Sequence, residues 1–476
     1  MFRTLGFIMA LHIAISASAG DLQLPDLGAS GGGLVTAAQE YDLGQRWQRM
    51  FRAQVSTTQD PFIQEYIENL TRTLANYSDL EDKRLDILVV DNPALNAFAV
   101  PGGVIGVNTG LFNYSQTEEQ FASILAHEIA HLSQRHFARN IEERRDKQIP
   151  NIAAMLASIL ILATAGGDAG IAALSVTQAA AIDSQLRFSR QMEQEADRIG
   201  MATMVRADLD PYAMPAMFEQ MLHAARFRQQ PPEFLITHPL TESRISDSKL
   251  RAQQYDKKQV PSSKNFELIK TRAQLHNEKN LNHSIRSFEG RLRTNSGNPE
   301  IPRYGLALAQ MKNRNLPAAN KNIDLLLDAE PNNFLYITTK AQIEAEEKKF
   351  DSAIKRLKAK TENHPSSHPL NIVLAEILMK AGRYAECEAL LLAHSERRPK
   401  DEYVWYLLAE AHGLAGHIYE VHTARTEYFM LNGMYKNAEN HVRHALKLVD
   451  KDRHTRAKLE QKLKEIQRFK REEERL

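Results

Sequence analysis

The sequence predicts a mainly α-helical protein in two parts, a domain of helices with a small β-sheet and then an all-α solenoid. In the first part, helical patterns surround one strand-rich stretch, RLDILVVDNPALNAFAVPGGVIGVN, at residues 84–108. In the second part every pattern is helical, and residues recur at intervals of 34. A polar segment with a proline, YDKKQVPSSKN, separates the two.

The N-terminus has the layout of a secretory signal peptide. An arginine precedes a short apolar run, and the small residues Ala17 and Ala19 follow, so we expect cleavage after Ala19. A membrane anchor is the alternative, but the run is too short to cross a bilayer of about 30 Å. We therefore expect residues 1–19 to be removed on export and the glycine-rich residues 20–33 to form a flexible lead-in.

Composition limits the class of partner. The chain has 60 Lys and Arg and 59 Asp and Glu, and Arg3 is the one charged residue of the predicted signal peptide, so the exported chain is neutral. That balance argues against a nucleic-acid partner. Cys387 is the single cysteine, which excludes an internal disulfide. We expect two domains, residues 34–252 and residues 265–476, with a linker at residues 253–264.

The second part repeats a helical pair. A small residue recurs in the first helix, a bulky residue opens the second helix, and a proline closes the unit, which is the tetratricopeptide pattern. Small residues let the paired helices approach closely, and the proline ends the second helix. The series are Ala273, Ala307, Ala341, Ala375 and Ala409, then Leu316, Phe350, Tyr384 and Ile418, then Pro331, Pro365 and Pro399. Solenoids of this kind bind peptides or partner proteins.

The register of the repeats changes near the end. Tyr435 comes only 17 residues after Ile418, so we expect one helix to be shared between overlapping units. Cys387 falls in register with Ala319 and Ala353, which predicts a small core residue. The charged C-terminal segment is expected to be a solvated capping helix.

The stretch LAHEIAHLSQRH indicates a metal site. His127 and His131 are four residues apart, so on a helix both imidazoles face one side and can share a metal ion. Glu128 need not be a ligand and could act as a general base on water. Such pentapeptides also arise by chance, and a catalytic zinc needs a third protein ligand. His136 lies at an unsuitable angle on a straight helix and is expected to be a polar residue at the helix end.

The stretch SRQMEQEADRIG supplies the third ligand. Glu193 and Asp197 are four residues apart and share a helical face, whereas Glu195 points elsewhere and is expected to be solvated. Ala196 and Gly200 would let this helix pack closely against the helix of the two histidines. We therefore predict Glu193 as the ligand and Asp197 as the outer carboxylate that orients a histidine.

The order HExxH and then ExxAD resembles the gluzincin metalloproteases typified by the CAAX prenyl proteases and HtpX. This resemblance implies a zinc metalloendopeptidase with one Zn²⁺ per chain, bound by His127, His131 and Glu193, in which Glu128 activates water. In the family, a segment like NAFAVPGGVIGVNTGLF supplies an edge strand beside the active site. An exposed edge can add an extended substrate as one more strand. We expect this substrate edge strand to be Val104, Ile105, Gly106, Val107 and Asn108.

A further motif, THPLTESR, contains His238 and Arg244. The resemblance places such a pair near the zinc, where it could stabilise the oxyanion of the tetrahedral intermediate. Alternatively, a neutral His238 could itself occupy the open zinc position and keep the enzyme latent. A third interpretation makes them a loop histidine and a surface arginine. The sequence leaves these alternatives open.

An apolar segment at residues 152–182 lies between the predicted ligands. The run Ile152–Ala165 is too short for a comfortable transmembrane span and is more typical of a buried or interfacial helix. We expect a lid over the active-site cleft. Peripheral contact with a membrane surface is the alternative.

The combination of signal peptide, protease domain and repeats resembles the bacterial periplasmic proteases of this family. That resemblance implies protein substrates, namely misfolded or stalled outer-membrane β-barrel proteins, contact with their assembly machinery, and a chaperone role for the repeats. The rival is a non-proteolytic scaffold with a closed or degenerate protease domain. A zinc esterase or amidase is less favoured because of the edge-strand segment.

Overall fold

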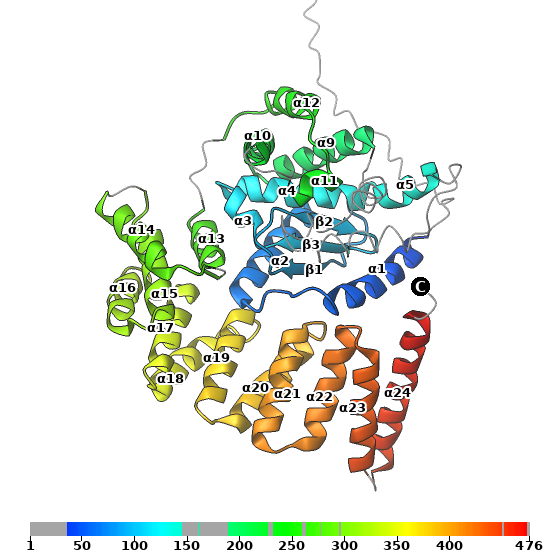
Figure 1. The fold of residues 1–476 in the computed structure, drawn as a ribbon, viewed down its shortest axis with the longest axis vertical. Helices are drawn as coiled ribbons and strands as arrows, with labels where there is room; N and C mark the ends of the chain where they lie inside the picture. The colour runs from blue at the N-terminus through cyan, green and yellow to red at the C-terminus, as the bar shows by residue number, and fades with distance from the viewer. Residues whose placement is uncertain are drawn as a thin grey trace, which may run out of the picture.

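The computed structural model describes residues 36–144, 160, 189–226, 232–258, 263–276, 278–294, 297–449 and 452–473. The predicted signal peptide and lead-in lie outside these residues, and so does the predicted lid at residues 152–182, apart from Leu160. The described part is mainly helical with one small sheet, followed by a helical solenoid, which confirms the predicted fold class (Figure 1). Of the described helices, none is long and apolar enough to cross a membrane.

The sheet has three strands, β1 (Asp86–Val90), β2 (Ala97–Val100) and β3 (Val104–Asn108). Their spatial order is β1-β3-β2, with β3 parallel to β1 and antiparallel to β2. The prediction that residues 104–108 form the edge strand is therefore wrong, because β3 is hydrogen-bonded on both sides. The chain reverses at Gly102 and Gly103, whose φ values of 80° and 81° suit glycine, and inserts β3 between its neighbours. Within the described part, the two outer strands of the sheet are β1 and β2.

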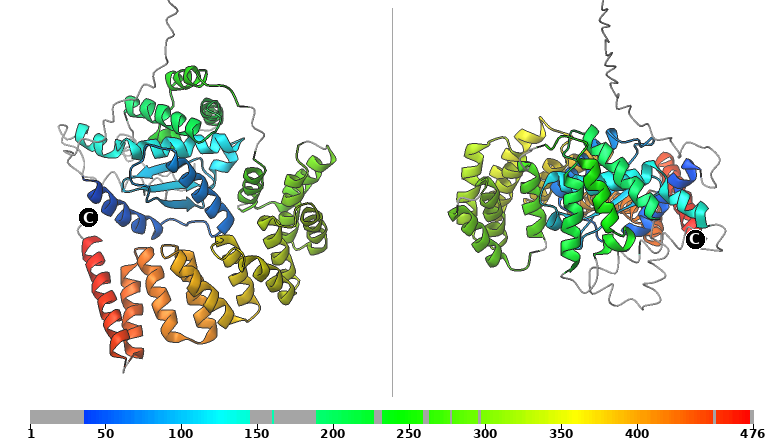
Figure 2. Two further views of the ribbon diagram at one scale, coloured as in Figure 1. Left: turned by 180° about the vertical axis from the view of Figure 1, so that it is seen from behind. Right: turned by 90° about the horizontal axis from the view of Figure 1, so that it is seen from above.

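Nine described helices surround this sheet. They are α1 (Ala37–Arg52), α2 (Pro61–Asn76), α3 (Leu111–Tyr114), α4 (Glu118–Ser133), α5 (His136–Arg144), α9 (Arg190–Arg206), α10 (Ala213–Arg226), α11 (Glu233–Thr237) and α12 (Glu242–Ala252). Helix α4 packs against β2 and α2 on one side and against α9 and α10 on the other. In Figures 1 and 2 it lies between the sheet and the α9–α12 layer. The central helix of this domain is thus the one that contains the HExxH motif.

Twelve helices follow in the repeat part: α13 (Lys264–His276), α14 (Leu281–Arg293), α15 (Glu300–Lys312), α16 (Leu316–Ala329), α17 (Phe334–Glu346), α18 (Phe350–Thr361), α19 (His368–Lys380), α20 (Tyr384–Arg397), α21 (Glu402–Ala415), α22 (Ile418–Leu431), α23 (Tyr435–Leu448) and α24 (Arg453–Glu473). The four predicted bulky residues open α16, α18, α20 and α22. Helix α22 packs against both α21 and α23, so it is the shared helix. Cys387 is buried beside Ala353 and Ala375 in the repeat core.

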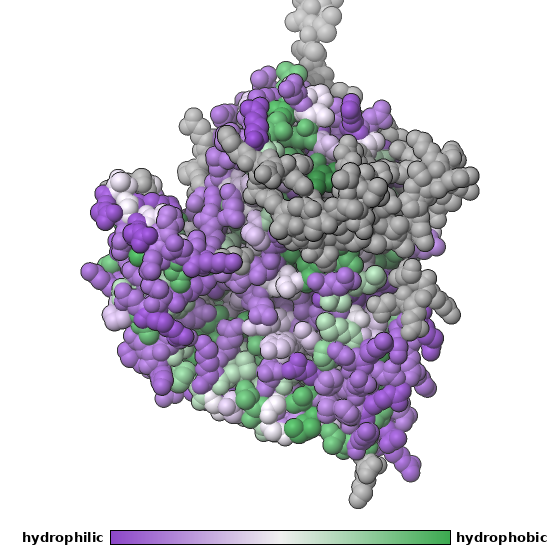
Figure 3. All heavy atoms as spheres, in the orientation of Figure 1, coloured by the Kyte–Doolittle hydropathy of each residue, from purple (hydrophilic) through white to green (hydrophobic). Residues whose placement is uncertain are grey.

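The repeats curve around the face of the domain opposite the HExxH helix (Figures 1 and 2). Ion pairs join the two parts: Arg398 with Glu68 at 2.7 Å, and Arg52 with Glu402 at 3.2 Å. The first repeat is joined more intimately, because Phe266 of α13 belongs to the same apolar core as the domain's own aromatic residues. The face seen in Figure 3 is largely hydrophilic over the repeats, with scattered hydrophobic residues.

Candidate metal centre

Two histidines of α4 point their Nε2 atoms at one another. Thr117 is the N-cap of helix α4, and its side-chain oxygen accepts a hydrogen bond from the backbone N–H of Gln120, which caps the first turn. Two turns further, His127 and His131 lie on one face, with 3.0 Å between their Nε2 atoms. Both side chains are buried. The spacing predicted from the sequence therefore brings the two imidazoles to a common point.

Helix α9 brings a carboxylate to that point. The oxygens of Glu193 lie 3.5 Å from Nε2 of His127 and 3.5 Å from Nε2 of His131. The helix comes this close because Gly200 lies directly against the α4 backbone, where a Cβ would be 3.1 Å from the carbonyl carbon of Ala126. This is the close packing that the small residues predict.

His238 completes a buried group of four. It follows α11, and its Nδ1 lies 3.0 Å from Glu193 Oε1 and 3.4 Å from His127 Nε2. One ligand atom from each of His127, His131, Glu193 and His238 lies within 4.8 Å of the others, so the four could hold one ion. The third interpretation, a loop histidine with a surface arginine, is therefore wrong, because the side chains of His238 and Arg244 are both buried.

Glu128 faces the same space from α4. Its side chain is fully buried, and neither carboxylate oxygen has a hydrogen-bond partner within the described part. Burial raises the pKa of Glu128, and the nearby His238 and His127 offset this only partly. Nε2 of His238 is 3.5 Å from Oε1 of Glu128. A buried carboxyl group of this kind is suited to exchanging a proton with a water molecule.

Asp197 and Arg244 form a layer behind the four groups. Oδ1 of Asp197 is 3.0 Å from Nδ1 of His127, which is the outer position predicted for this carboxylate. Arg244 donates to both oxygens of Asp197 at 2.7 Å, and its Nη1 lies 2.7 Å from Glu193. Although burial opposes it, the pKa of Glu193 is held well below its usual range by His238 and Arg244.

The expectation that Arg244 stabilises an oxyanion is not supported by its contacts. Its guanidinium donates to Asp197 and to the carbonyl of Pro239 and is ion-paired with Glu193, so its donors are directed at these groups. Arg244 thus holds the two acids of α9 in place. Although burial would raise it, the pKa of Asp197 is lowered by this arginine and by His127.

Two residues of this layer differ from what the sequence predicts. His136 was expected to be a polar residue at the end of the zinc-binding helix, with no contact to the site, and Glu195 was expected to be solvated. His136 is fully buried, with its Nδ1 2.9 Å from Nδ1 of His131 and its Nε2 3.2 Å from Glu195. The hydrogen bond from His136 is the main reason that the pKa of Glu195 falls to about 2. The helix does not run straight to His136, because α4 ends at Ser133.

These residues fit a divalent metal. Two neutral imidazoles and one carboxylate are a ligand set that zinc uses in catalytic sites. Each α4 histidine also has an outer partner at Nδ1, which leaves Nε2 for the metal. The two unpartnered oxygens of Glu128 would face a water molecule beside the ion.

The fold and the site together define a metallopeptidase with helical repeats. The chain belongs to peptidase family M48, whose model matches residues 61–252. A tetratricopeptide-repeat model matches residues 344–411. The protein is therefore a metalloprotease, and the prediction of its family is confirmed.

The chain is similar along most of its length to particular members. It is 34% identical over 416 residues to the beta-barrel assembly-enhancing protease of Escherichia coli, covering 87% of this chain and 85% of the relative. It is 33% identical over 435 residues to the putative beta-barrel assembly-enhancing protease of Vibrio cholerae, covering 90% and 89%. The mitochondrial metalloendopeptidase OMA1 of Arabidopsis thaliana is 31% identical over 194 residues, 41% of this chain and 36% of that protein. The predicted resemblance to bacterial proteases of this family that carry helical repeats is thus confirmed.

Proposed function

We propose that this protein is a zinc-dependent endopeptidase in which His127, His131 and Glu193 bind the metal ion. The observation that supports this most is the convergence of two Nε2 atoms and the Glu193 carboxylate beside the buried carboxyl group of Glu128. When bound, zinc supplies a Lewis acid that polarises a peptide carbonyl and acidifies water.

The remaining steps belong to the chain itself. Glu128 takes the proton of the attacking water and passes it to the leaving amine, a role suited to a buried carboxyl whose pKa is raised. Asp197 holds Nδ1 of His127, and Arg244 holds the carboxylates of Asp197 and Glu193, so the ligands keep one orientation. The site is thus prepared before a substrate arrives.

The substrate would pair with β2 rather than with residues 104–108. The backbone N–H of Asn108 donates to the carbonyl of Asn96, so residues 98 and 100 pair with β3 by hydrogen bonds. Alternation then directs the N–H and C=O of Ala97 and Ala99 to the outer edge. Strand β2 also packs against α4, the helix that contains Glu128. An extended peptide on this edge would bring its own backbone past the catalytic carboxyl group.

His238 is proposed to be a latch. Its Nδ1 lies as close to Glu193 and His127 as those groups lie to one another, within the group of four that could share one ion. A fourth protein ligand fills the position that a catalytic zinc keeps open for water. Displacement of His238 would then be required for turnover, and an oxyanion role becomes available only after that movement.

The protein is proposed to act in the periplasm on misfolded or stalled outer-membrane β-barrel proteins. This rests on the predicted signal peptide and on the names of the relatives, beta-barrel assembly-enhancing proteases. The repeats are proposed to hold the substrate or its assembly machinery and so to give chaperone support. Residues 152–182 are proposed from the sequence to form a lid or, alternatively, to contact a membrane surface. This segment, apart from Leu160, lies outside the described residues.

The test is cleavage of an unfolded outer-membrane protein by the purified mature chain, with the zinc content of each sample measured. Glu128→Gln is expected to keep zinc and to lower the rate by roughly 10²–10⁴-fold. His238→Ala is expected to keep zinc and to cleave faster than wild type. Inactivity of every variant despite bound zinc would favour the rival, a non-proteolytic scaffold. A His238→Ala rate below wild type would favour the oxyanion role.

A further inference from the structure

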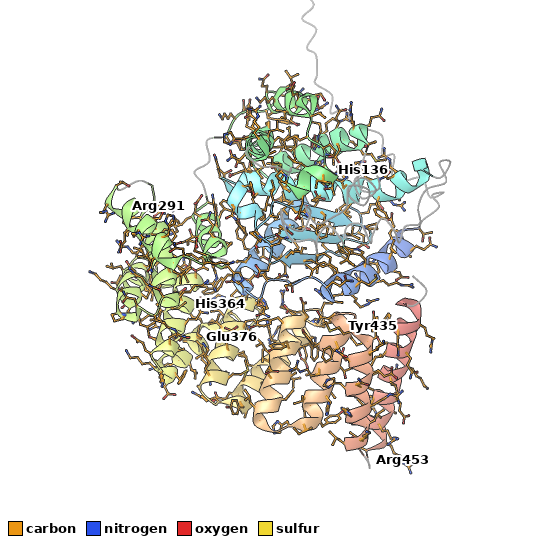
Figure 4. The ribbon with its side chains drawn as sticks, viewed as in Figure 1. His136, Arg291, His364, Glu376, Tyr435 and Arg453 are labelled. Atoms are coloured by element: carbon orange, nitrogen blue, oxygen red, sulfur yellow. The ribbon has the colours of Figure 1, made fainter. Side chains whose placement is uncertain are left out.

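The outer partners of the two α4 histidines are chemically different. Nδ1 of His127 faces a carboxylate, Asp197, at 3.0 Å. Nδ1 of His131 instead faces another imidazole, that of His136, at 2.9 Å. Nε2 of His136 in turn lies 3.2 Å from Oε2 of Glu195, which also accepts from Arg139 at 3.0 Å. His136 is labelled in Figure 4, where α5 begins beside α4.

The positions of the protons in the row of side chains His131–His136–Glu195 follow from chemistry. If Nε2 of His131 binds a metal, its Nδ1 must carry the proton and donate it. Nδ1 of His136 is then the acceptor, so the proton of neutral His136 is on Nε2 and is donated to Glu195. Arg139 donates to the same carboxylate. Every donor in the row therefore meets an acceptor, and each hydrogen bond of the row is donated in the direction from the metal site toward Glu195.

A local backbone feature brings His136 into this position. Helix α4 ends at Ser133, and Arg135 has φ of 48°, in the left-handed region that a side chain rarely adopts. That conformation is unfavourable for a residue with a side chain. It turns the chain so that His136, the first residue of α5, lies beside His131. Arg135 is held there by Glu40, at 3.2 Å from its Nε.

We propose that His136 and Glu195 are positioning residues of the metal centre, which fix the tautomer and ring orientation of His131 through the row His131–His136–Glu195. The proposal rests on the zinc-endopeptidase function proposed above. Glu195 lies two residues after Glu193 on α9, so the same helix supplies a ligand and the far end of the row. A metal held between α4 and α9 would thereby be linked to α9 twice, once through Glu193 and once through His131, His136 and Glu195.

The test measures how fast zinc leaves each variant when excess chelator is added, using a colour indicator for free Zn²⁺. His136→Leu removes the acceptor and is expected to release zinc roughly 10–100-fold faster, the usual effect of losing an outer partner. His136→Asn places an amide oxygen near the position of Nδ1 and should stay closer to wild type. Glu195→Gln weakens the far end of the row and should give an intermediate rate. His283→Ala and Glu289→Gln, exposed residues of α14, are the controls.

Several outcomes would overturn the proposal. Wild-type release from His136→Leu would do so, and so would equal release from His136→Leu and His136→Asn, because the acceptor would then be irrelevant. A wild-type rate in Glu195→Gln would remove Glu195 from the row. Melting of the metal-free variants separates a loss of fold from a loss of zinc retention. Failure of the proposed function is distinguishable, since a wild-type chain that binds no zinc would show it before any variant is made.

Discussion

Gly200 of α9 lies against the backbone of Ala126, immediately before the first histidine of the metal centre. A Cβ at position 200 would lie 3.1 Å from the Ala126 carbonyl carbon and 3.1 Å from the amide nitrogen of His127. These atoms belong to the α4 backbone, so a shift of the backbone to make room for a Cβ would also move His127.

Gly200→Ala is therefore expected to destabilise the protein by about 1–3 kcal/mol, the usual cost of overpacking. Zinc release should accelerate because α9 is pushed away from His127. The matched control is Gly290→Ala in α14, where a new Cβ meets nothing within 4 Å. That change should stabilise by about 0.5–1 kcal/mol, since glycine disfavours a helix interior. Chemical denaturation of both variants checks the prediction, and equal shifts would contradict it.

Two arginines of α12 should differ sharply. Arg244 is buried and ion-paired with Glu193 and Asp197, so Arg244→Met leaves two buried acids without their cation and should cost roughly 3–5 kcal/mol. Arg251 is part-exposed and pairs with Asp247 one turn earlier, so Arg251→Met should cost less than about 1 kcal/mol. Urea unfolding measures both. Similar costs for the two changes would show that the buried pairing does not stabilise the fold.

The outer edge of β2 can be tested with proline, which lacks a backbone N–H. Ala97→Pro removes an amide that points to the edge, where proline is tolerated, so the fold should survive while the KM for an extended substrate rises. Val100→Pro removes an amide that pairs with β3 and should lower the melting temperature instead. If Ala97→Pro leaves KM unchanged, substrates do not pair with this edge.

Stability should fall in mild acid through a buried histidine of the repeats. Burial lowers the pKa of His368 to about 4, below the ordinary value of 6.5. The unfolded chain therefore binds a proton between these values while the folded chain does not. The contribution of His368 to the free energy of unfolding is therefore fully present above the unfolded pKa. It falls as the pH drops toward 4, by about 2 kcal/mol near pH 5. Urea unfolding of wild type and His368→Gln at about pH 7.5 and about pH 5 measures this, and the variant should lose less between the two. Equal losses would exclude His368 as a source.

The sequence was most informative where function depends on helical spacing. His127, His131 and Glu193 meet because residues four apart share a helical face and because Gly200 allows the second helix to approach. Four repeat helices, α16, α18, α20 and α22, begin at the predicted bulky residues, because the 34-residue period of the sequence is also the period of the helical pairs.

Predictions failed where the chain leaves a regular element. The alternation of residues along a strand does not determine the order of three short strands in a sheet. Residues 104–108 were therefore expected at an edge, whereas β3 lies in the centre and β2 at an edge. His136 was placed on a straight helix, whereas the left-handed Arg135 redirects it to His131. Glu195 does point away from the metal face, as predicted, but toward α5 rather than solvent. Such contacts depend on where a helix ends, which residue patterns fix only to within a few positions.

The apolar core shared by α13 and the first domain has a consequence for cooperativity. Phe266 packs with Phe112 and Phe121, and Arg272 reaches Asp60 at the start of α2, with 2.6 Å between Nε and Oδ2. Separating the chain between residues 252 and 264 would therefore expose buried apolar surface on each fragment. The protease domain and the first repeat should therefore unfold together in one thermal transition. If a chain without its repeats loses activity, the first explanation is an unfolded protease domain, and loss of a bound partner comes second.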